Sequence, residues 1–469
     1  MPIMDLVMPL SSFRVHVVLA ACLALRVVSV SAQTYHVGTY GAPCTAGDLA
    51  MGRFLLTCGA GGTYRYAEPD DIPPAPEGGF TSRPFWYPPL AMVFPVQSPP
   101  SCPLTGRVTF TSPVIAPEDL APIIPQGMMV ADHVTPIDHG YFGVTPLVKP
   151  RATRTEDDFV AVRAPADGDV TEVSLLGSPT SIRVVVAHGC DTYSVYMVLN
   201  RLSGALAFLQ DDLQARGSLR VNVRILAGEE FGRQRDNPLD FSVHDGGAWL
   251  RGFASPFSYT SSESWKPYTV DPWPYFAPDL AELYTAHMQR QAEPRWGRID
   301  LDVPGTASGN WFLDGTLGYS GMLLETLRSE SQPAGGMVEG KNTYAWSHLA
   351  LVPHWVQPSK WLLSTGWFAD ERGDPKQLLI EPDAGQPAPG ALTVAHGVVV
   401  YRLRQWGFAT PLVNEAPLPV GYDIEGGVTA GFAAVQVLDG DRLSVELFPG
   451  VTTRPVFTDF GPNRRLYRR

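Results

Sequence analysis

The sequence predicts a mainly β protein, built from two antiparallel β domains with few helices. Short runs in which β-branched and polar residues alternate recur from about residue 105 to the C-terminus. The 469 residues include 45 Gly and 44 Pro, and only 17% of them are charged. An alternation with a period of two places successive side chains on opposite faces of a strand, and Gly and Pro separate such runs by turns. This composition favours short strands over long helices.

Residues 1–32 have the pattern of a cleavable signal segment. Arg14 supplies a positive charge, residues 15–25 are apolar, and small residues precede an expected cleavage before Gln33. The 11 residues of the apolar stretch are too few to cross a hydrocarbon core, which needs about 20. We therefore expect an exported chain without a transmembrane span, either secreted or held in the periplasm or cell envelope.

The same segment supports a second hypothesis for the mature N-terminus. Leu19-Ala20-Ala21-Cys22 resembles a bacterial lipobox, in which Cys22 becomes the lipid-bearing first residue of a lipoprotein. The other interpretation is that these four residues occur by chance in a stretch rich in Ala and Leu. Simple secretion and a lipid-anchored form therefore both stay open.

The remaining cysteines predict two disulfides. Four follow the signal segment: Cys44, Cys58, Cys102 and Cys190. An even number in an exported chain suggests two bridges, although four cysteines allow three pairings. Cys44 and Cys58 flank a short Gly-containing stretch, which predicts a small module at residues 33–67 with a hairpin pinned at its base. A covalent bridge suits so small a unit because it buries little apolar surface. Cys102 then remains to pair with Cys190.

Residues 68–104 predict a Pro-rich linker or wrapping arm. The segments IPPAPEGG, RPFWYPP and SPPSCP stiffen the chain and prevent regular strand pairing. Phe85, Trp86 and Tyr87 within it indicate that the arm packs onto a neighbouring part of the chain.

Residues 105–245 form the first predicted β domain. Runs such as DFVAVRA, SIRVVVAH and TYSVYMVL alternate apolar and polar residues between turn residues. One helix is expected to interrupt them at residues 205–217, where Gly217 ends it.

Residues 246–298 predict an aromatic and Pro-rich connector with one helix. Asp279, directly after Pro278, is the expected N-cap of that helix. An apolar stripe follows at helical spacing, which we interpret as core packing. Its members are Leu280, Leu283, Tyr284 and Met288.

Residues 299–469 predict the second β domain, a barrel or sandwich. Short strands such as HLALVPHW, GVVVYRLRQW and RLSVELFPG recur there between Gly- and Pro-containing loops.

Charge and missing motifs exclude several function classes. The formal net charge of -12 argues against nonspecific nucleic-acid binding, which needs a basic face to neutralise phosphates. It also argues against electrostatic docking on anionic lipid. No dinucleotide-binding GxGxxG after a strand, phosphate loop, CxxC pair or GxSxG elbow is present in the sequence.

Five segments of the first β domain, in their order, resemble the lysostaphin-like zinc endopeptidases, whose domain is also called the duplicated hybrid motif. The segments are Val162–Val170 (VRAPADGDV), Arg183–Gly189 (RVVVAHG), TYSVYMVLNRLSG from Thr192, VRILAGEEFG, and Pro238–Val243 (PLDFSV). The resemblance covers roughly 115 residues and implies an antiparallel β domain that hydrolyses cell-wall peptides with zinc. GNWFLDGT and VELFPG in the second domain are similar to uncharacterised exported proteins and imply no activity.

The family's zinc ligands do not carry over to this chain. The resemblance implies ligands at the His and Asp of HxxxD and at the second His of HxH. His133 and Asp138 are separated by one residue too many, and the alignment that begins HxxxD at Asp138 ends it at Phe142. The middle histidine of the active site falls on Val198, and the HxH motif falls on Pro238 and Asp240. Because a catalytic zinc site needs three protein ligands and an open position, zinc is not expected.

A reduced set of polar residues stays available as a candidate site: His133, Asp138, His139 and Asp240. We expect no metal site and no catalytic residues, with weak calcium binding by the carboxylates as the one metal alternative. Asp240 is expected to pair with Arg233 or Arg235, or to face Asp138. Three further histidines are interpreted as structural: His188, His348 and His354.

The leading hypothesis is an exported, noncatalytic protein with a binding or scaffolding role at the cell envelope. Its partner is expected to be a cell-wall glycan or peptide or another envelope protein, unless an apolar insert of the chain itself fills the groove. One alternative is an active metal-dependent peptidoglycan endopeptidase with a relocated site. Another is a surface protein in which the arm and the Cys44/Cys58 module mediate assembly.

Overall fold

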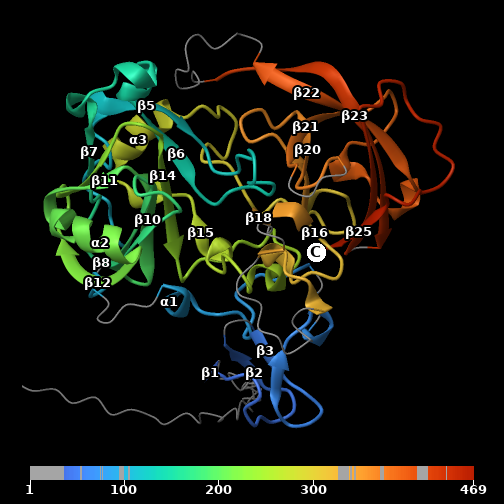
Figure 1. The fold of residues 1–469 in the computed structure, drawn as a ribbon, viewed down its shortest axis with the longest axis horizontal. Helices are drawn as coiled ribbons and strands as arrows, with labels where there is room; N and C mark the ends of the chain where they lie inside the picture. The colour runs from blue at the N-terminus through green and yellow to red at the C-terminus, as the bar shows by residue number, and fades with distance from the viewer. Residues whose placement is uncertain are drawn as a thin grey trace, which may run out of the picture. The chain divides into compact units, whose positions relative to one another are not determined.

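Two antiparallel β assemblies, a sheet and a closed barrel, make up most of the chain, which confirms the predicted mainly β class (Figure 1). The computed structural model describes residues 36–469 apart from short gaps. The gaps are residues 53–54, 74, 77, 95–99, 104–105, 326–336, 339–340, 343–344, 370–373, 409–420 and 440. The predicted signal segment and Cys22 lie outside the described residues. Residues 35–469 group into one compact unit.

The first assembly is an eight-stranded sheet in the order β12, β8, β9, β10, β14, β6 and β5, with β15 beside β14. Its strands are β5 (Leu120–Ile124), β6 (Gly140–Val144), β8 (Gly168–Leu175), β9 (Ile182–Gly189), β10 (Thr192–Leu199), β12 (Ser218–Ile225), β14 (Leu239–Asp245) and β15 (Thr269–Val270). A second sheet has the order β11, β13 and β7. Its strands are β7 (Val160–Arg163), β11 (Arg201–Leu202) and β13 (Glu230–Gln234).

Alternation along these strands gives the large sheet two buried faces. Val184 on β9 and Phe241 on β14 belong to the main core of the sheet. Val185, the next residue on β9, belongs to a separate apolar cluster on the opposite face. That opposite face, which we call the covered face, also bears Asp240, because Asp240 pairs with Met197 of that second cluster. The polar candidate residue therefore lies on a sheet face that is itself packed.

Three α-helices occur in the described part of the chain. α2 (Gln210–Arg216) ends at Gly217, whose φ of 76° is left-handed, and this confirms the predicted stop. α3 (Pro278–Ala286) corrects one prediction, because its N-cap is Ala277 and Asp279 lies in the first turn. Proline is favoured at the first helical position because its missing N–H has no partner there. None of the described helices is long and apolar enough to span a membrane.

The N-terminal module is a four-stranded sheet closed by one disulfide. Its strands are β1 (His36–Val37), β2 (Leu49–Met51), β3 (Leu55–Cys58) and β4 (Tyr64–Tyr66). Cys44 and Cys58 are bonded, with their Cα atoms 5.7 Å apart. Cys102 and Cys190 are bonded as well, with a Cα separation of 4.6 Å. Both predicted pairings are confirmed, and two disulfides are consistent with an exported protein.

The Pro-rich arm of residues 68–104 packs against the covered face. Tyr87 and Leu90 are fully buried, and Trp86 and Phe94 are 2% and 5% exposed. These four side chains share one apolar cluster with residues of β9 and β10. The short helix α1 (Leu90–Val93) lies within the arm. Phe85, by contrast, is 42% exposed.

The second assembly is a closed antiparallel barrel, so the barrel alternative of the sequence prediction is the observed one. Its strands, in order around the barrel, are β16 (Gly309–Leu313), β19 (His348–Pro353), β20 (Trp361–Thr365), β21 (Lys376–Glu381), β22 (Val399–Phe408), β23 (Ile424–Asp439), β24 (Arg442–Pro449) and β25 (Arg465–Arg468). A separate two-stranded sheet pairs β17 (Met337–Val338) with β18 (Lys341–Asn342).

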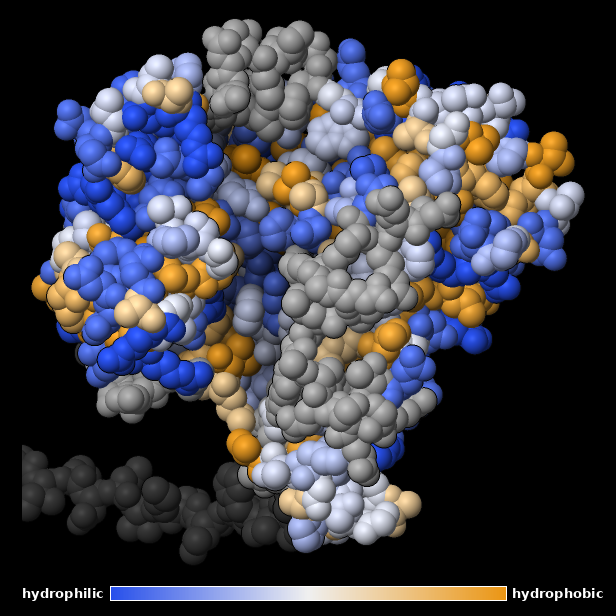
Figure 2. Space-filling view, in the orientation of Figure 1, coloured by the Kyte–Doolittle hydropathy of each residue, from blue (hydrophilic) through white to orange (hydrophobic). Residues whose placement is uncertain are grey.

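Side chains fill the barrel and also attach it to the rest of the chain. Leu351 and Leu363 belong to the barrel core. Ala350 and Val352, which alternate with Leu351 on β19, pack with Met129 in a separate cluster. On the face that Figure 2 shows, hydrophilic residues surround scattered hydrophobic ones.

Candidate functional site

The candidate site lies where β6 and β14 run side by side. Asp138 and His139 directly precede β6, and Asp240 is the second residue of β14. Asp240 pairs with Tyr141 across the two strands, which brings it close to the residues before β6. The fold therefore gathers three of the four candidate residues, although about 100 residues separate them in the sequence.

His139 bridges the two carboxylates. Its Nδ1 lies 3.1 Å from Asp138 Oδ1, at hydrogen-bond distance. Its Nε2 lies 3.4 Å from Asp240 Oδ2, which is close enough for an ion pair but long for a hydrogen bond. We call Asp138, His139 and Asp240 the buried triad. His133 lies beside it, with its ring centroid 6.1 Å from that of His139.

Two residues of the connector complete the site. Trp265 Nε1 donates a hydrogen bond of 2.6 Å to Asp138 Oδ2. Lys266 Nζ lies 3.8 Å from Asp138 Oδ1 and 3.0 Å from Glu263 Oε2. The sequence analysis missed both, although a lone lysine inside the aromatic segment Trp265–Tyr268 could have pointed to a buried charge.

All charged members of the site are withdrawn from solvent. The exposed fractions are 5% for Asp138, 4% for His139, 6% for Asp240 and 1% for Lys266. Buried ionised groups are tolerated only when they are paired. Each charged side chain of the site therefore needs its neighbours in the site as charge or hydrogen-bond partners.

Burial and mutual attraction set the protonation of the site. Burial raises the pKa of Asp240 to about 7, with His139 opposing and Asp138 adding to the rise. Burial also disfavours charge on His139, but Asp240 and Asp138 outweigh it and raise its pKa. Burial alone would raise the pKa of Asp138, yet Lys266 and His139 hold it well below its usual range. Asp138 is therefore ionised at neutral pH, and the His139–Asp240 pair retains a proton there.

The triad is poorly suited to hold a metal. A catalytic zinc site needs three protein ligands and one open position. Asp138 already accepts from Trp265 and faces Lys266, whose positive charge opposes a cation. Within the described ranges, no group of three or more His, Cys, Asp or Glu residues is arranged to hold a metal ion.

The positions that the family resemblance assigns to further active-site residues are structural. Phe142 is fully buried in the main core. Val198 has a left-handed φ of 53° within an irregular stretch of β10. Two alternatives were open for Asp240, an arginine partner or a position facing Asp138. The arginine alternative is wrong, since Arg233 binds Glu230 and Arg235 binds Asp236. Asp240 instead pairs with His139, which also pairs with Asp138, so the two carboxylates lie on either side of one imidazole.

The three histidines that the sequence analysis interpreted as structural have hydrogen-bond partners within the chain. His188 lies 2.9 Å from the carbonyl oxygen of Asp167 and 2.7 Å from Ser194 Oγ. His348 bonds the Tyr319 carbonyl oxygen at 2.9 Å, and His354 Nδ1 accepts from two backbone N–H groups. All three lie in the interior.

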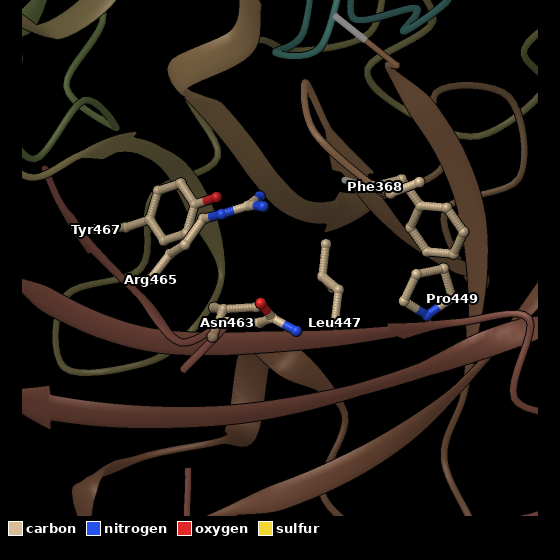
Figure 3. Close-up of a pocket in the computed structure, with 8 residues that line it drawn as sticks. Phe368, Leu447, Pro449, Asn463, Arg465 and Tyr467 are labelled. Atoms are coloured by element: carbon tan, nitrogen blue, oxygen red, sulfur yellow. The ribbon is translucent and has the colours of Figure 1, made fainter. Parts of the chain in front are cut away.

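A small pocket on the barrel offers little room for a ligand. Figure 3 shows Asn463, Arg465 and Tyr467 beside the apolar residues Phe368, Leu447 and Pro449. Its volume of about 30 Å³ is enough for one or two water molecules. The guanidinium of Arg465 stacks 3.6 Å above the ring of Trp367.

No family model matches the chain, and no curated protein matches its sequence.

Proposed function

We propose that this chain is an exported, noncatalytic protein of the cell envelope, in which a degenerate lysostaphin-like domain serves binding or scaffolding. The observation that carries the proposal is the burial of the triad beneath Trp265 and Lys266. A hydrolase must bring water and substrate to its catalytic groups. Here the triad is at most 6% exposed, and His139 and Trp265 already bind the two carboxylate oxygens of Asp138.

The packing of the covered face supports the same proposal. One form of the hypothesis is that an apolar insert of the chain itself fills the retained groove. Tyr87, Leu90 and Phe94 of the arm share an apolar cluster with residues of β9 and β10, which supports this form. Recognition of a cell-wall glycan, a peptide or another envelope protein then falls to the remaining surface of the molecule.

Metal content and hydrolysis test the noncatalytic proposal together. After dialysis we expect far less than one zinc per chain, and no chelator-sensitive release of peptides from purified peptidoglycan. We also expect the protein to sediment with intact peptidoglycan without cleaving it. Weak calcium binding by the carboxylates is compatible with the proposal.

A pair of variants distinguishes the alternative of a relocated peptidase site. Equimolar zinc together with hydrolysis that is lost in Asp138→Ala would overturn the noncatalytic proposal. Asp132→Ala is the matched control, because Asp132 is an exposed carboxylate close in sequence. Hydrolysis lost equally in both variants would indicate general damage instead.

A further inference from the structure

Side chains attach the arm to the body of the molecule. Tyr87 Oη donates a 3.0 Å hydrogen bond to the Ser264 carbonyl oxygen, and Tyr268 Oη donates one of 2.5 Å to the Pro88 carbonyl oxygen. The backbone hydrogen bonds of the arm, such as Met92 N–H to the Pro89 carbonyl oxygen, are local. The arm can therefore leave without breaking a strand of the large sheet.

Beneath the arm lies an aromatic shelf, which we define as Tyr193, His244, Trp249, Phe257, Trp265 and Tyr268. Phe94 lies 5.2 Å from Tyr193 and 5.8 Å from Trp265, between ring centroids. Tyr87 lies 5.1 Å from Trp249. Removal of the arm would thus uncover a continuous set of aromatic faces.

A surface cavity lies at the C-terminal end of the arm. It has a volume of about 260 Å³ and is lined by Ala91 and Pro100 of the arm and by Ala187 and Tyr193 of the sheet.

The Cys102–Cys190 disulfide fastens the arm beside that cavity. Cys190 and Asp191 form the two-residue turn between β9 and β10, and both have left-handed φ values, of 51° and 55°. Two-residue hairpin loops commonly have positive φ at both residues. Cys102 is an exposed residue, whereas Cys190 is partly buried.

We propose that this disulfide is a redox-controlled clasp that holds the arm over the aromatic shelf. A thiolate of a dithiol reductant attacks Cys102 Sγ, and Cys190 leaves as a thiolate. The second thiolate of the reductant then releases Cys102, so that the reductant is oxidised by two electrons and the protein gains two thiols. With the clasp open, the arm detaches and the shelf becomes accessible. This inference is independent of the proposed function, because arm release is measured without a ligand.

Graded reduction of the full mature chain tests the clasp. Samples treated with increasing dithiothreitol are alkylated, mapped for free cysteines and followed by hydrogen exchange. We expect Cys102–Cys190 to open before Cys44–Cys58, because neither Cys44 nor Cys58 is as exposed as Cys102. Amides of residues 85–94 should then exchange at least tenfold faster, and chymotrypsin should cleave faster after Trp86, which is 2% exposed in the closed arm. Strands β9 and β10 should keep their protection.

Two double variants provide matched controls. Cys102→Ser/Cys190→Ser should show the fast arm exchange without reductant, whereas Cys44→Ser/Cys58→Ser should keep the arm protected. Arm protection that persists after Cys102–Cys190 opens would overturn the proposal. Opening that occurs only together with loss of protection in β9 and β10 would overturn it as well. If the first variant does not fold, reduction of the native protein decides the question.

Discussion

A single buried lysine pairs with one carboxylate of the candidate site, that of Asp138. Lys266 lies within 3.8 Å of Asp138 and 3.0 Å of Glu263, and its side chain is only 2% exposed. Removing one partner of a buried ion pair leaves the other partner as an uncompensated charge. Removal of the positive charge of Lys266 should therefore destabilise the folded chain far more than removal of the charge of a surface lysine.

Lys266→Met is expected to lower the free energy of unfolding by about 3–5 kcal/mol, because Asp138 stays buried without its cation. Chemical denaturation followed by fluorescence measures the change. Lys376→Met is the control, since Lys376 pairs with Asp374 while its side chain is 47% exposed. Exposed pairs of this kind contribute about 0–1 kcal/mol. Equal effects of the two variants would contradict the role of Lys266.

Asp240→Asn tests the protonation of the triad. The pKa of Asp240 in the folded chain, about 7, lies above the unfolded value near 4. The folded state therefore holds a proton that the unfolded state releases, and the stability contributed by Asp240 is lost as pH rises from about 4 to 7.

The variant lacks this loss, so its stability relative to the natural chain should improve by about 3 kcal/mol between pH 5 and pH 8. Denaturant midpoints at the two pH values measure the difference. Asp236→Asn, at a carboxylate paired with Arg235, should show the same offset at both. A flat difference for Asp240→Asn would mean that its carboxylate is ionised throughout.

At the scale of elements, local sequence patterns predicted the strands and helix ends that depend on neighbouring residues. The period of two in SIRVVVAH and TYSVYMVL became β9 and β10, and Gly217 ended a helix because it adopts a left-handed φ. The helix at Pro278 was also predicted, but its cap was misplaced by two residues. Proline and the acidic residue after it both favour a helix start, so composition alone did not fix the boundary.

The candidate site was only partly predictable from the sequence, because some of its contacts join residues that are far apart in the chain. Asp138, His139 and Asp240 stood out through their place in the resemblance, and strand pairing brought them together. The hydrogen bond from Trp265 to Asp138 joins residues 127 positions apart. The sequence around Trp265 lacks the apolar periodicity of a strand or a helix, so it does not predict where this part of the connector lies. Contacts of that kind arise from tertiary packing.

The N-terminal module allows a prediction about one element. Cys44 and Cys58 are 14 positions apart, and the chain-entropy model gives about 3 kcal/mol for a loop of this length. Cys44→Ser/Cys58→Ser should therefore speed amide exchange in β2 and β3 strongly. Exchange in β9 and β10, on a different sheet, is the internal control and should stay unchanged. Unaltered exchange in β2 and β3 would show that their packing suffices.

At the scale of the whole molecule, histidines are buried in both assemblies. In five of them burial is the main cause of a lowered pKa, and they are His133, His188, His244, His348 and His354. The pKa is about 4 for the first three and about 3 for the last two. These histidines are neutral in the folded chain at any pH above about 5.

We therefore predict that acid destabilises the whole molecule. Each folded pKa lies below the unfolded value near 6.5, so below that pH the unfolded chain binds more protons and stability falls. Three groups act in the opposite direction, because their pKa values are raised in the folded chain: Asp240, Asp302 and His139. They offset part of the loss. Five histidines oppose these three groups, so we expect a net loss of stability as the pH falls below the unfolded histidine pKa.

Denaturant unfolding between pH 8 and pH 5 measures this loss directly. The slope of the free energy of unfolding against pH gives the number of protons taken up, and we expect several near pH 5.5. His188→Gln should reduce that number by about one, because glutamine keeps a hydrogen bond to Asp167 or Ser194 without titrating. His287→Gln is the matched control, since His287 Nδ1 donates a hydrogen bond to the Leu283 carbonyl oxygen but the residue is only partly buried. A slope below one proton, or an equal effect of both variants, would show that the buried histidines are not the source of the acid sensitivity.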